Sequence, residues 1–341
     1  MPPMPGRVRL TDVSPRDGLQ NEPATIPTAE KLRLIELLCR AGLDEIEVTS
    51  FVSPKAVPQL ADAADLCDGL AALLQGQRGR GEGNPGTRAP APVFSALTPN
   101  LTGLGGALEA NTRAQGRLIG RVGVFTAASE EFCRRNINAT IAESLLRFAP
   151  VIERAHAEGL GVRGYISCVI ACPFQGPVAP GEVVRVAEGL LGLGVDELDL
   201  GDTIGAATPE STERLLTAYA RVVPLADDAP GARVRTTLHL HDTRGRAADC
   251  VRTALGMGVR SFDGSVAGLG GCPYASRPGG RAPGNIATEL LMRTVEEAGY
   301  SVGADAGRLA LAGEFARALA RRARADGAEP GTSRVVAEPH R

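Results

Sequence analysis

Two of the four histidines in the chain stand one residue apart, at positions 239 and 241 in the stretch TTLHLHDT. β-branched residues lead into this stretch, which is typical of a strand. Side chains of a strand alternate between its faces, so both imidazoles point the same way and can reach one point. The pair predicts a two-point anchor for a divalent metal, and two histidines hydrogen-bonded in a polar pocket are the alternative.

Oxygen ligands for the same metal are predicted at Asp17 and Asn285. Asp17 also fits a turn-forming aspartate in PRDG, and Asn285 also fits the N-cap of a helix. Imidazoles with oxygen ligands disfavour a structural zinc site, which prefers thiolates. They favour Mg²⁺ or Mn²⁺ with open positions, and ferrous iron, as in facial-triad oxygenases, is the alternative metal.

Two further side chains can carry chemistry beside such a metal. Arg16 precedes Asp17 and can stabilise a developing enolate or alkoxide oxygen, or it can simply pair with Glu47. Cys272 lies in the glycine-rich stretch AGLGGCPYA, where a thiol near an arginine and a metal can act as acid or base. An ordinary loop cysteine is the alternative for Cys272, and Cys168 and Cys172 are predicted to be packing residues.

Strand-like and helix-like segments alternate along the whole chain. Strands are predicted over residues 7–13, 44–50, 91–98, 120–127, 162–168, 196–202, 234–241 and 261–268. Helices are predicted over residues 28–42, 58–74, 101–111, 138–159, 180–194, 208–223, 246–258 and 285–299. The first helix is predicted to start with a threonine cap at Thr28 and to end at Gly42.

Eight such pairs predict an α/β fold, a (β/α)8 TIM barrel with a short C-terminal helical extension. A doubly wound sheet is disfavoured because no glycine-rich phosphate turn follows the first strand. We expect the barrel over residues 1–300 with a flexible insertion at 75–92. The extension is expected over 301–325, and residues 326–341 are expected to form a disordered tail.

The reactive residues fall at the carboxyl ends of the predicted strands, where barrel enzymes place their active sites. They are Arg16, Asp17, Glu47, Ser50, Cys168, Asp202, Thr203, His239, His241 and, in the loop after the last strand, Cys272. In a closed barrel the first and seventh strands flank the eighth, so Asp17 and the two histidines are expected to meet.

Bulk properties exclude several classes of protein. The formal net charge is −2, which gives no reason to expect a nucleic-acid partner or an anionic membrane surface. No apolar run reaches the ~18 residues of a membrane span, and no apolar signal segment opens the sequence. Seven scattered cysteines predict reduced thiols in a cytoplasmic protein rather than a disulfide framework.

Several long motifs, in order along the chain, resemble the 3-hydroxy-3-methylglutaryl-CoA lyase family. They are VSPRDGLQNEP, EVTSFVSPKAVPQ, FTAASEEFCRRNIN, RGYISCVIACPF, LGDTIGAATP, HLHDTRG and VAGLGGCPYA. The resemblance implies divalent-metal-dependent retro-Claisen cleavage of 3-hydroxy-3-methylglutaryl-CoA to acetyl-CoA and acetoacetate. It also places the chain in a broader group of metal-dependent barrel lyases and Claisen-type enzymes.

The resemblance implies a role for each residue that matches a motif. Asp17, His239, His241 and Asn285 would hold Mg²⁺ or Mn²⁺, and Arg16 would stabilise the enolate. Cys272 would donate the proton, Glu47 would support activity, and Asp202 would take the hydroxyl proton. Substrate-binding residues are predicted at Arg16, Gln20, Ser50 and Thr203.

Departures from the family pattern leave the acyl group open. The segment SRPGGRAP makes the loop before Asn285 long, Arg244 follows HDT, and the 75–92 insertion is unusual. A longer 3-hydroxy-3-alkylglutaryl-CoA, a Claisen-type synthase or aldolase, an iron oxygenase and a barrel that only binds a CoA ester are the alternatives. We predict a homo-oligomer, a dimer or a tetramer, and CoA phosphates near Arg134, Arg135 and Asn136.

Overall fold

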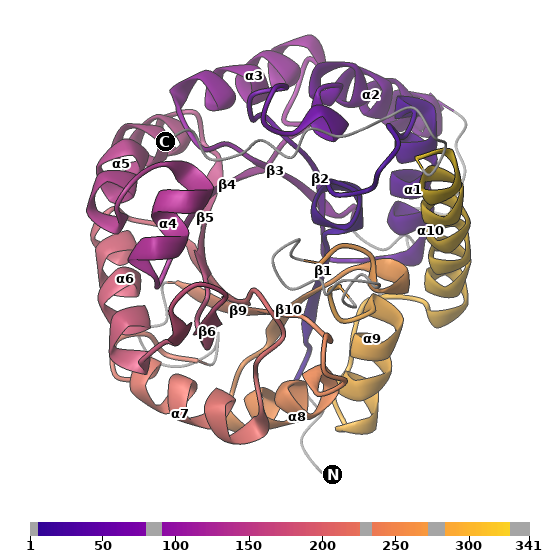
Figure 1. Cartoon of the computed structure of the whole chain (residues 1–341). Helices are drawn as coiled ribbons and strands as arrows, with labels where there is room; N and C mark the ends of the chain where they lie inside the picture. The colour runs from indigo at the N-terminus through magenta and orange to yellow at the C-terminus, as the bar shows by residue number, and fades with distance from the viewer. Residues whose placement is uncertain (1–5, 80–90, 226–233, 272–283, 328–341) are drawn as a thin grey trace.

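A computed structural model of the chain describes residues 6–79, 91–225, 234–271 and 284–327. Eight parallel strands close into a barrel in the order β1-β10-β9-β8-β5-β4-β3-β2, and helices surround it (Figure 1). The predicted TIM barrel is therefore confirmed. Its strands are β1 (Arg9–Asp12), β2 (Glu45–Ser50), β3 (Val93–Leu97), β4 (Arg121–Ala127), β5 (Gly161–Ser167), β8 (Glu197–Asp202), β9 (Arg235–Leu240) and β10 (Ser261–Gly264).

The helices follow the strands in the expected alternation. They are α1 (Thr28–Ala41), α2 (Ala63–Gly79), α3 (Leu101–Arg113), α4 (Glu130–Ile137), α5 (Ile141–Ala157), α6 (Pro180–Gly192), α7 (Pro209–Tyr219), α8 (Ala247–Met257), α9 (Thr288–Glu297) and α10 (Ala306–Asp326). Short turns η1 (Ser14–Gly18), η2 (Pro58–Leu60) and η3 (Val266–Gly268) and a small hairpin of β6 (Ala171–Cys172) and β7 (Gly176–Pro177) lie in the loops.

Side-chain alternation gives the barrel its two surfaces. Leu238 and Leu240 on β9 are buried in the apolar layer between strands and helices, as predicted. The inward side chains, by contrast, include many charges. Arg163, on β5, forms ion pairs with Glu197 at 2.7 Å and Asp263 at 3.1 Å. The barrel interior thus holds a buried ionic network beneath the carboxyl ends of the strands.

Several predicted boundaries are wrong in detail. Helix α2 continues to Gly79, so the insertion predicted to begin at residue 75 starts inside a helix, and residues 80–90 lie outside the described part. The predicted cap at Thr28 is wrong because Pro27 precedes the helix, and the Thr28 hydroxyl donates instead to Asp62 (2.7 Å). Gly42 ends α1 with φ 82°, as expected for a left-handed cap.

The sequence patterns missed two elements and made one strand too long. Helix α4 and the β6–β7 hairpin were not predicted. The eighth strand ends at Gly264 rather than residue 268, because Ala267 takes a left-handed conformation (φ 61°) within η3. The predicted short extension is the 21-residue helix α10, which packs against α1 outside the barrel (Figure 1).

None of the described helices is long and apolar enough to cross a membrane.

Candidate metal centre

The two histidines meet at the carboxyl end of β9. Their Nε2 atoms lie 3.4 Å apart, and both rings face the barrel mouth from one strand end. The Nδ1 atom of His241 lies 2.7 Å from the carbonyl oxygen of Thr203, and that of His239 lies 3.4 Å from the Asp263 carboxylate. Because acceptors face both Nδ1 atoms, each Nδ1 is placed to donate a proton, and each Nε2 faces the other ring.

Asp17 reaches the same point from the turn η1, directly after β1. Its carboxylate accepts hydrogen bonds from Arg16 (2.8 Å), Gln20 (2.9 Å) and the amide of Asn285 (2.8 Å). Burial alone would raise the pKa of Asp17, but Arg16 and the nearby imidazoles outweigh it and hold the pKa below its usual value. Asp17 is therefore an ionised carboxylate facing two imidazoles.

The turn η1 is fixed by a buried carboxylate at the end of β1. Asp12 accepts hydrogen bonds from the backbone of Ser14 (2.9 Å) and Val266 (3.0 Å) and from the hydroxyl of Thr288 (2.6 Å). These three donors come from η1, η3 and α9. One side chain thus ties together the segments around Asp17, which the sequence patterns did not reveal.

The donor atoms fit a divalent cation. Those of Asp17, His239 and His241 all lie within 4.8 Å of one another. Burial and the neighbouring His239 lower the pKa of His241 to about 4, so its ring is neutral and able to ligate at neutral pH. Burial lowers the pKa of His239, but its hydrogen bond to Asp263 and the charge of Asp17 outweigh this effect and raise it, so this position favours a positive charge, either a proton or a metal ion. The observed geometry therefore fits the predicted ligand set.

Asn285 lies against this donor set. Its amide nitrogen donates to Asp17 (2.8 Å) and to the carbonyl of Leu269 (2.9 Å), and its side chain also bonds His241. The alternative role as a helix cap is excluded, since α9 begins at Thr288 with Ala287 before it. Asn285 is therefore positioned to place an amide oxygen at the centre.

A second cluster, Asp199, His239 and Asp263, has similar spacing but different chemistry. The guanidinium of Arg163 already lies 3.4 Å from Asp199 and 3.1 Å from Asp263. The Arg163 guanidinium thus already pairs with this cluster, and burial and the neighbouring Asp263 raise the pKa of Asp199 well above its usual value. Asp263 also contacts the His239 ring. Asp263 was missed in the sequence, although it is an acidic residue on a buried strand in register with His239.

Arg16 is held at the rim of the centre by a chain of buried groups. Its Nε donates to Glu47 Oε2 (2.6 Å), and the Tyr165 hydroxyl donates to Glu47 Oε1 (2.9 Å). Only 8% of the Arg16 surface is exposed. Burial alone would lower the pKa of its guanidinium, but the ion pairs with Glu47 and Asp17 outweigh it and raise the pKa above its usual value. The predicted Arg16–Glu47 pair is present, and Arg16 remains a fixed positive charge next to Asp17.

The other predicted site residues lie near the centre with their polar atoms engaged. Thr203 accepts from the Cys168 backbone through its hydroxyl (2.8 Å) and holds His241 through its carbonyl. Ser50 is buried, and its hydroxyl points to the carbonyl of Leu97 (3.4 Å). Their roles in substrate binding stay predictions.

Asp202 is buried, and its two carboxylate oxygens accept the backbone N–H groups of Ala206 and Ala207, at 2.9 and 2.8 Å. Burial raises its pKa despite these two hydrogen bonds. Asp202 thus shapes the turn before α7, and its role as a base stays a prediction. Cys272, the predicted proton donor, lies outside the described residues.

The glycine-rich segment before Cys272 packs directly on the donor set. Gly270 has φ 100°, and a Cβ atom there would lie 2.7 Å from the Asn285 amide nitrogen and 3.1 Å from Asp17. Only glycine fits this conformation and this approach. The second glycine of AGLGG is therefore required by the close packing of Asn285 and Asp17.

We expect Gly270→Ala to lower the affinity for Mn²⁺ and to destabilise the fold by about 1–3 kcal/mol, because the methyl group displaces Asp17 and Asn285. Electron paramagnetic resonance titration and urea unfolding measure the two effects. Gly256→Ala in α8 is the matched control, since its Cβ would meet nothing within 4 Å. Unchanged Mn²⁺ affinity in Gly270→Ala would contradict the expectation.

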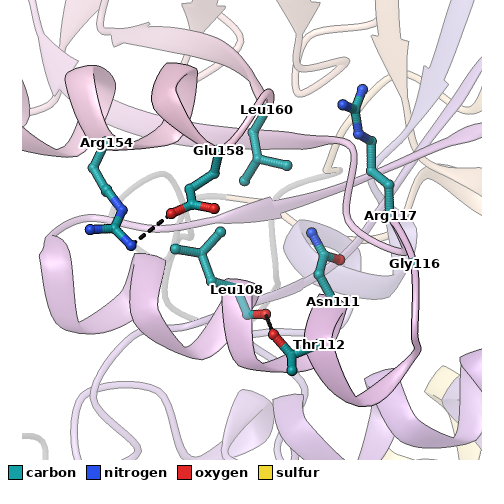
Figure 2. Close-up of a pocket in the computed structure, with 8 residues that line it drawn as sticks. All are labelled: Leu108, Asn111, Thr112, Gly116, Arg117, Arg154, Glu158 and Leu160. Carbon is teal, nitrogen blue, oxygen red and sulfur yellow. Dashed lines mark hydrogen bonds and ion pairs between the residues drawn. The ribbon is translucent and has the colours of Figure 1, made fainter.

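Figure 2 shows residues that line a separate cavity of about 450 Å³. Residues from α3, the loop before β4 and the end of α5 line it, and Arg154 pairs with Glu158 at its edge (2.6 Å). Since its loop residues Gly116, Arg117 and Leu160 precede strands β4 and β5, the cavity opens at their amino ends, away from the metal centre.

Comparison with known proteins gives a consistent answer. The family model described as HMGL-like matches residues 7–315. A Pseudomonas aeruginosa protein named 3-hydroxy-3-isohexenylglutaryl-CoA/hydroxymethylglutaryl-CoA lyase is 43% identical, over 91% of this chain and 92% of its own.

Two solved structures are also similar. The HMG-CoA lyase of Brucella melitensis superposes with a TM-score of 0.79 at 42% identity, covering 93% of this chain and 99% of that one. An HMG-CoA lyase from Acinetobacter baumannii, solved with coenzyme A and 3-methylmalate, gives 0.77 at 32% identity and covers 96% of both chains. With its barrel, its paired histidines and these relatives, the chain belongs to the HMGL-like family.

Proposed function

We propose that the protein cleaves 3-hydroxy-3-methylglutaryl-CoA to acetyl-CoA and acetoacetate with the help of a bound divalent cation. One observation carries the proposal: the Arg16 guanidinium lies 2.8 Å from Asp17, whose carboxylate meets the two imidazoles within 4.8 Å. Family membership supports the same reaction. The acyl-CoA class of substrate is supported by the coenzyme A bound to the Acinetobacter relative.

The reaction breaks the bond between C2 and C3 of the acyl group. A base must remove the C3 hydroxyl proton, the thioester must accept the released electron pair, and the new methyl group must receive a proton. Mg²⁺ or Mn²⁺, held by Asp17, His239, His241 and Asn285, would acidify the C3 hydroxyl as a Lewis acid. Side chains would supply the base, the charge that stabilises the enolate, and the proton donor.

Arg16 meets the second need in this proposal. Its Nε is committed to Glu47, and its positive charge stays fixed where an enolate oxygen would form. Rigid placement matters because a preorganised charge requires little rearrangement as the reaction proceeds. Asp202 is the proposed base, since each of its oxygens keeps a second lone pair beyond its backbone hydrogen bond. Cys272 is the proposed proton donor.

A longer 3-hydroxy-3-alkylglutaryl-CoA is the second candidate substrate. The Pseudomonas aeruginosa relative carries both an isohexenyl and a methyl substrate in its name. A longer alkyl group changes only the substituent on C3, so the same side chains would serve. A homo-oligomeric assembly and a cytoplasmic location stay predictions.

Removal of the metal tests the proposal. We expect purified protein to release acetyl-CoA from 3-hydroxy-3-methylglutaryl-CoA, excess chelator to abolish release, and added Mg²⁺ or Mn²⁺ to restore it. The assay is repeated with thioesters of increasing alkyl length, and the ratio of kcat/KM values identifies the preferred chain. A cleavage rate that excess chelator leaves unaffected would overturn the metal-dependent mechanism.

A further inference from the structure

The segment from Arg16 to Glu22 contacts two different parts of the site. Arg16 and Asp17 belong to the centre, and Gln20 donates to Asp17 (2.9 Å). The next residue, Asn21, turns elsewhere: its amide nitrogen donates to the carbonyl oxygen of Gly271 (3.2 Å). Among the described residues, no metal-binding side chain bonds Asn21. The side-chain amides of Gln20 and Asn21 therefore hold different parts of the site, the first Asp17 and the second the Gly271 peptide.

Gly271 is the last residue before Cys272. It is buried, and it follows a segment in which Ala267, Gly268, Gly270 and Gly271 itself all have positive φ, from 61° to 116°. A peptide unit is planar, so its carbonyl oxygen also fixes the direction of the following N–Cα bond. A hydrogen bond to the Gly271 carbonyl thus restrains the orientation of the Gly271 peptide, at the end of the segment that packs on the donor set.

Asn21 is itself held from the outside of the barrel. The neighbouring Glu22 has a fully buried carboxylate, and Arg324 near the end of α10 donates to both of its oxygens, at 3.0 and 2.8 Å. On the same segment, Gln59 donates to the carbonyl of Ala24 (2.8 Å) and accepts from the backbone N–H of Ile26 (2.8 Å). These contacts leave little freedom to the backbone that carries Asn21.

We propose that Asn21 is a positioning residue for the lyase reaction: its amide sets the Gly271 peptide, and the Arg324–Glu22 ion pair holds Asn21 in place. The inference rests on the proposed function, because it concerns the residue that follows Gly271. It assigns Asn21 a task distinct from that of Gln20. It also makes helix α10 part of the active-site support.

The test compares two neighbouring substitutions in the full-length protein loaded with Mn²⁺. We expect Asn21→Ala to lower kcat for 3-hydroxy-3-methylglutaryl-CoA by about tenfold to a hundredfold, the range for a small misplacement of a reacting group. Its KM and its affinity for Mn²⁺ should stay within about twofold of the wild type. Gln20→Ala should instead weaken Mn²⁺ binding, because Gln20 donates a hydrogen bond to Asp17.

Further variants separate positioning from folding. Asn21→Asp has almost the same volume but no donor, so it should lose kcat as Asn21→Ala does. Asn21→Gln keeps the amide and should recover part of the rate. Arg324→Ala should lower kcat in the same direction. Arg322→Ala on the same helix, which removes an exposed pair with Glu30, should leave kcat unchanged and serves as the matched control.

The outcomes distinguish the inference from the proposed function. Wild-type kcat in both Asn21→Ala and Asn21→Asp overturns the positioning role while metal-dependent cleavage stands. A rise in KM alone in Asn21→Ala also overturns the positioning role, because it would mean that Asn21 contacts the substrate. A loss of Mn²⁺ affinity as large as in Gln20→Ala overturns it too, because it would mean that Asn21 supports metal binding. A wild-type protein that cleaves no thioester with Mn²⁺ present overturns the proposed function itself.

Discussion

His241→Ala should abolish tight Mn²⁺ binding and lower kcat for thioester cleavage by about a thousandfold or more. The imidazole is neutral, its Nδ1 proton is committed to the Thr203 carbonyl (2.7 Å), and its Nε2 faces His239 and Asp17. An alanine removes one of the two nitrogen donors and leaves a gap that water fills without the same geometry. The loss therefore affects both binding of the cation and the reaction that depends on it.

Electron paramagnetic resonance with Mn²⁺ measures the binding loss, and steady-state release of acetyl-CoA measures the rate. His156→Ala is the matched control, because that histidine lies at the surface and pairs only with the exposed Asp196 among the described side chains. Circular dichroism verifies that each variant is folded. A folded His241→Ala protein with wild-type Mn²⁺ affinity would show that the imidazole pair is not a metal anchor.

Arg16→Lys should lower kcat by about a hundredfold to a thousandfold while the protein still binds Mn²⁺. Lysine keeps the positive charge but loses the planar group that donates to Glu47 and Asp17 at once. Its ammonium group can satisfy one of these carboxylates and then leaves the other buried and uncompensated. The charge is therefore displaced from the position where the enolate oxygen forms.

Steady-state kinetics with saturating Mn²⁺ separate this effect from that of His241→Ala. The expected signature is a fall in kcat with a much smaller change in metal affinity. Arg154→Lys is the matched control and should retain full activity, because Arg154 on α5 forms an exposed pair with Glu158, the residue that follows this helix. Equal rates for Arg16→Lys and the wild type would mean that charge alone, without a fixed geometry, is enough.

His241→Ala and Arg16→Lys together test whether metal binding and enolate stabilisation depend on different residues. We expect metal affinity to depend on the Asp17–imidazole set and the rate at saturating metal to depend on the fixed guanidinium. A result in which both variants lose only metal affinity would favour a purely structural Arg16. The geometry agrees with this expectation, because Arg16 contacts Asp17 through Nη1 and Glu47 through Nε and Nη2.

The sequence by itself determined the barrel, and it predicted the candidate donor residues that the structure brings together. Alternation of strand and helix patterns requires parallel strands, and parallel strands in a closed barrel gather their carboxyl ends at one face. The spacing of His239 and His241 places both rings on one side of one strand. These inferences need only the local periodicity of strands and helices, which can be read from the sequence. They also use the rule that eight alternating strand–helix pairs close into a barrel.

Tertiary structure alone decided what holds those residues in place. Asp263 beneath His239, Tyr165 behind Glu47, and Asn21 at Gly271 join residues far apart in the chain. Local pattern cannot assign such pairs, because they depend on the register between strands and on the path of each loop. The predictions of the helix cap and of the strand end failed for the same reason. The Thr28 hydroxyl bonds Asp62 on another segment, and Ala267 takes a left-handed conformation among contacts with other segments.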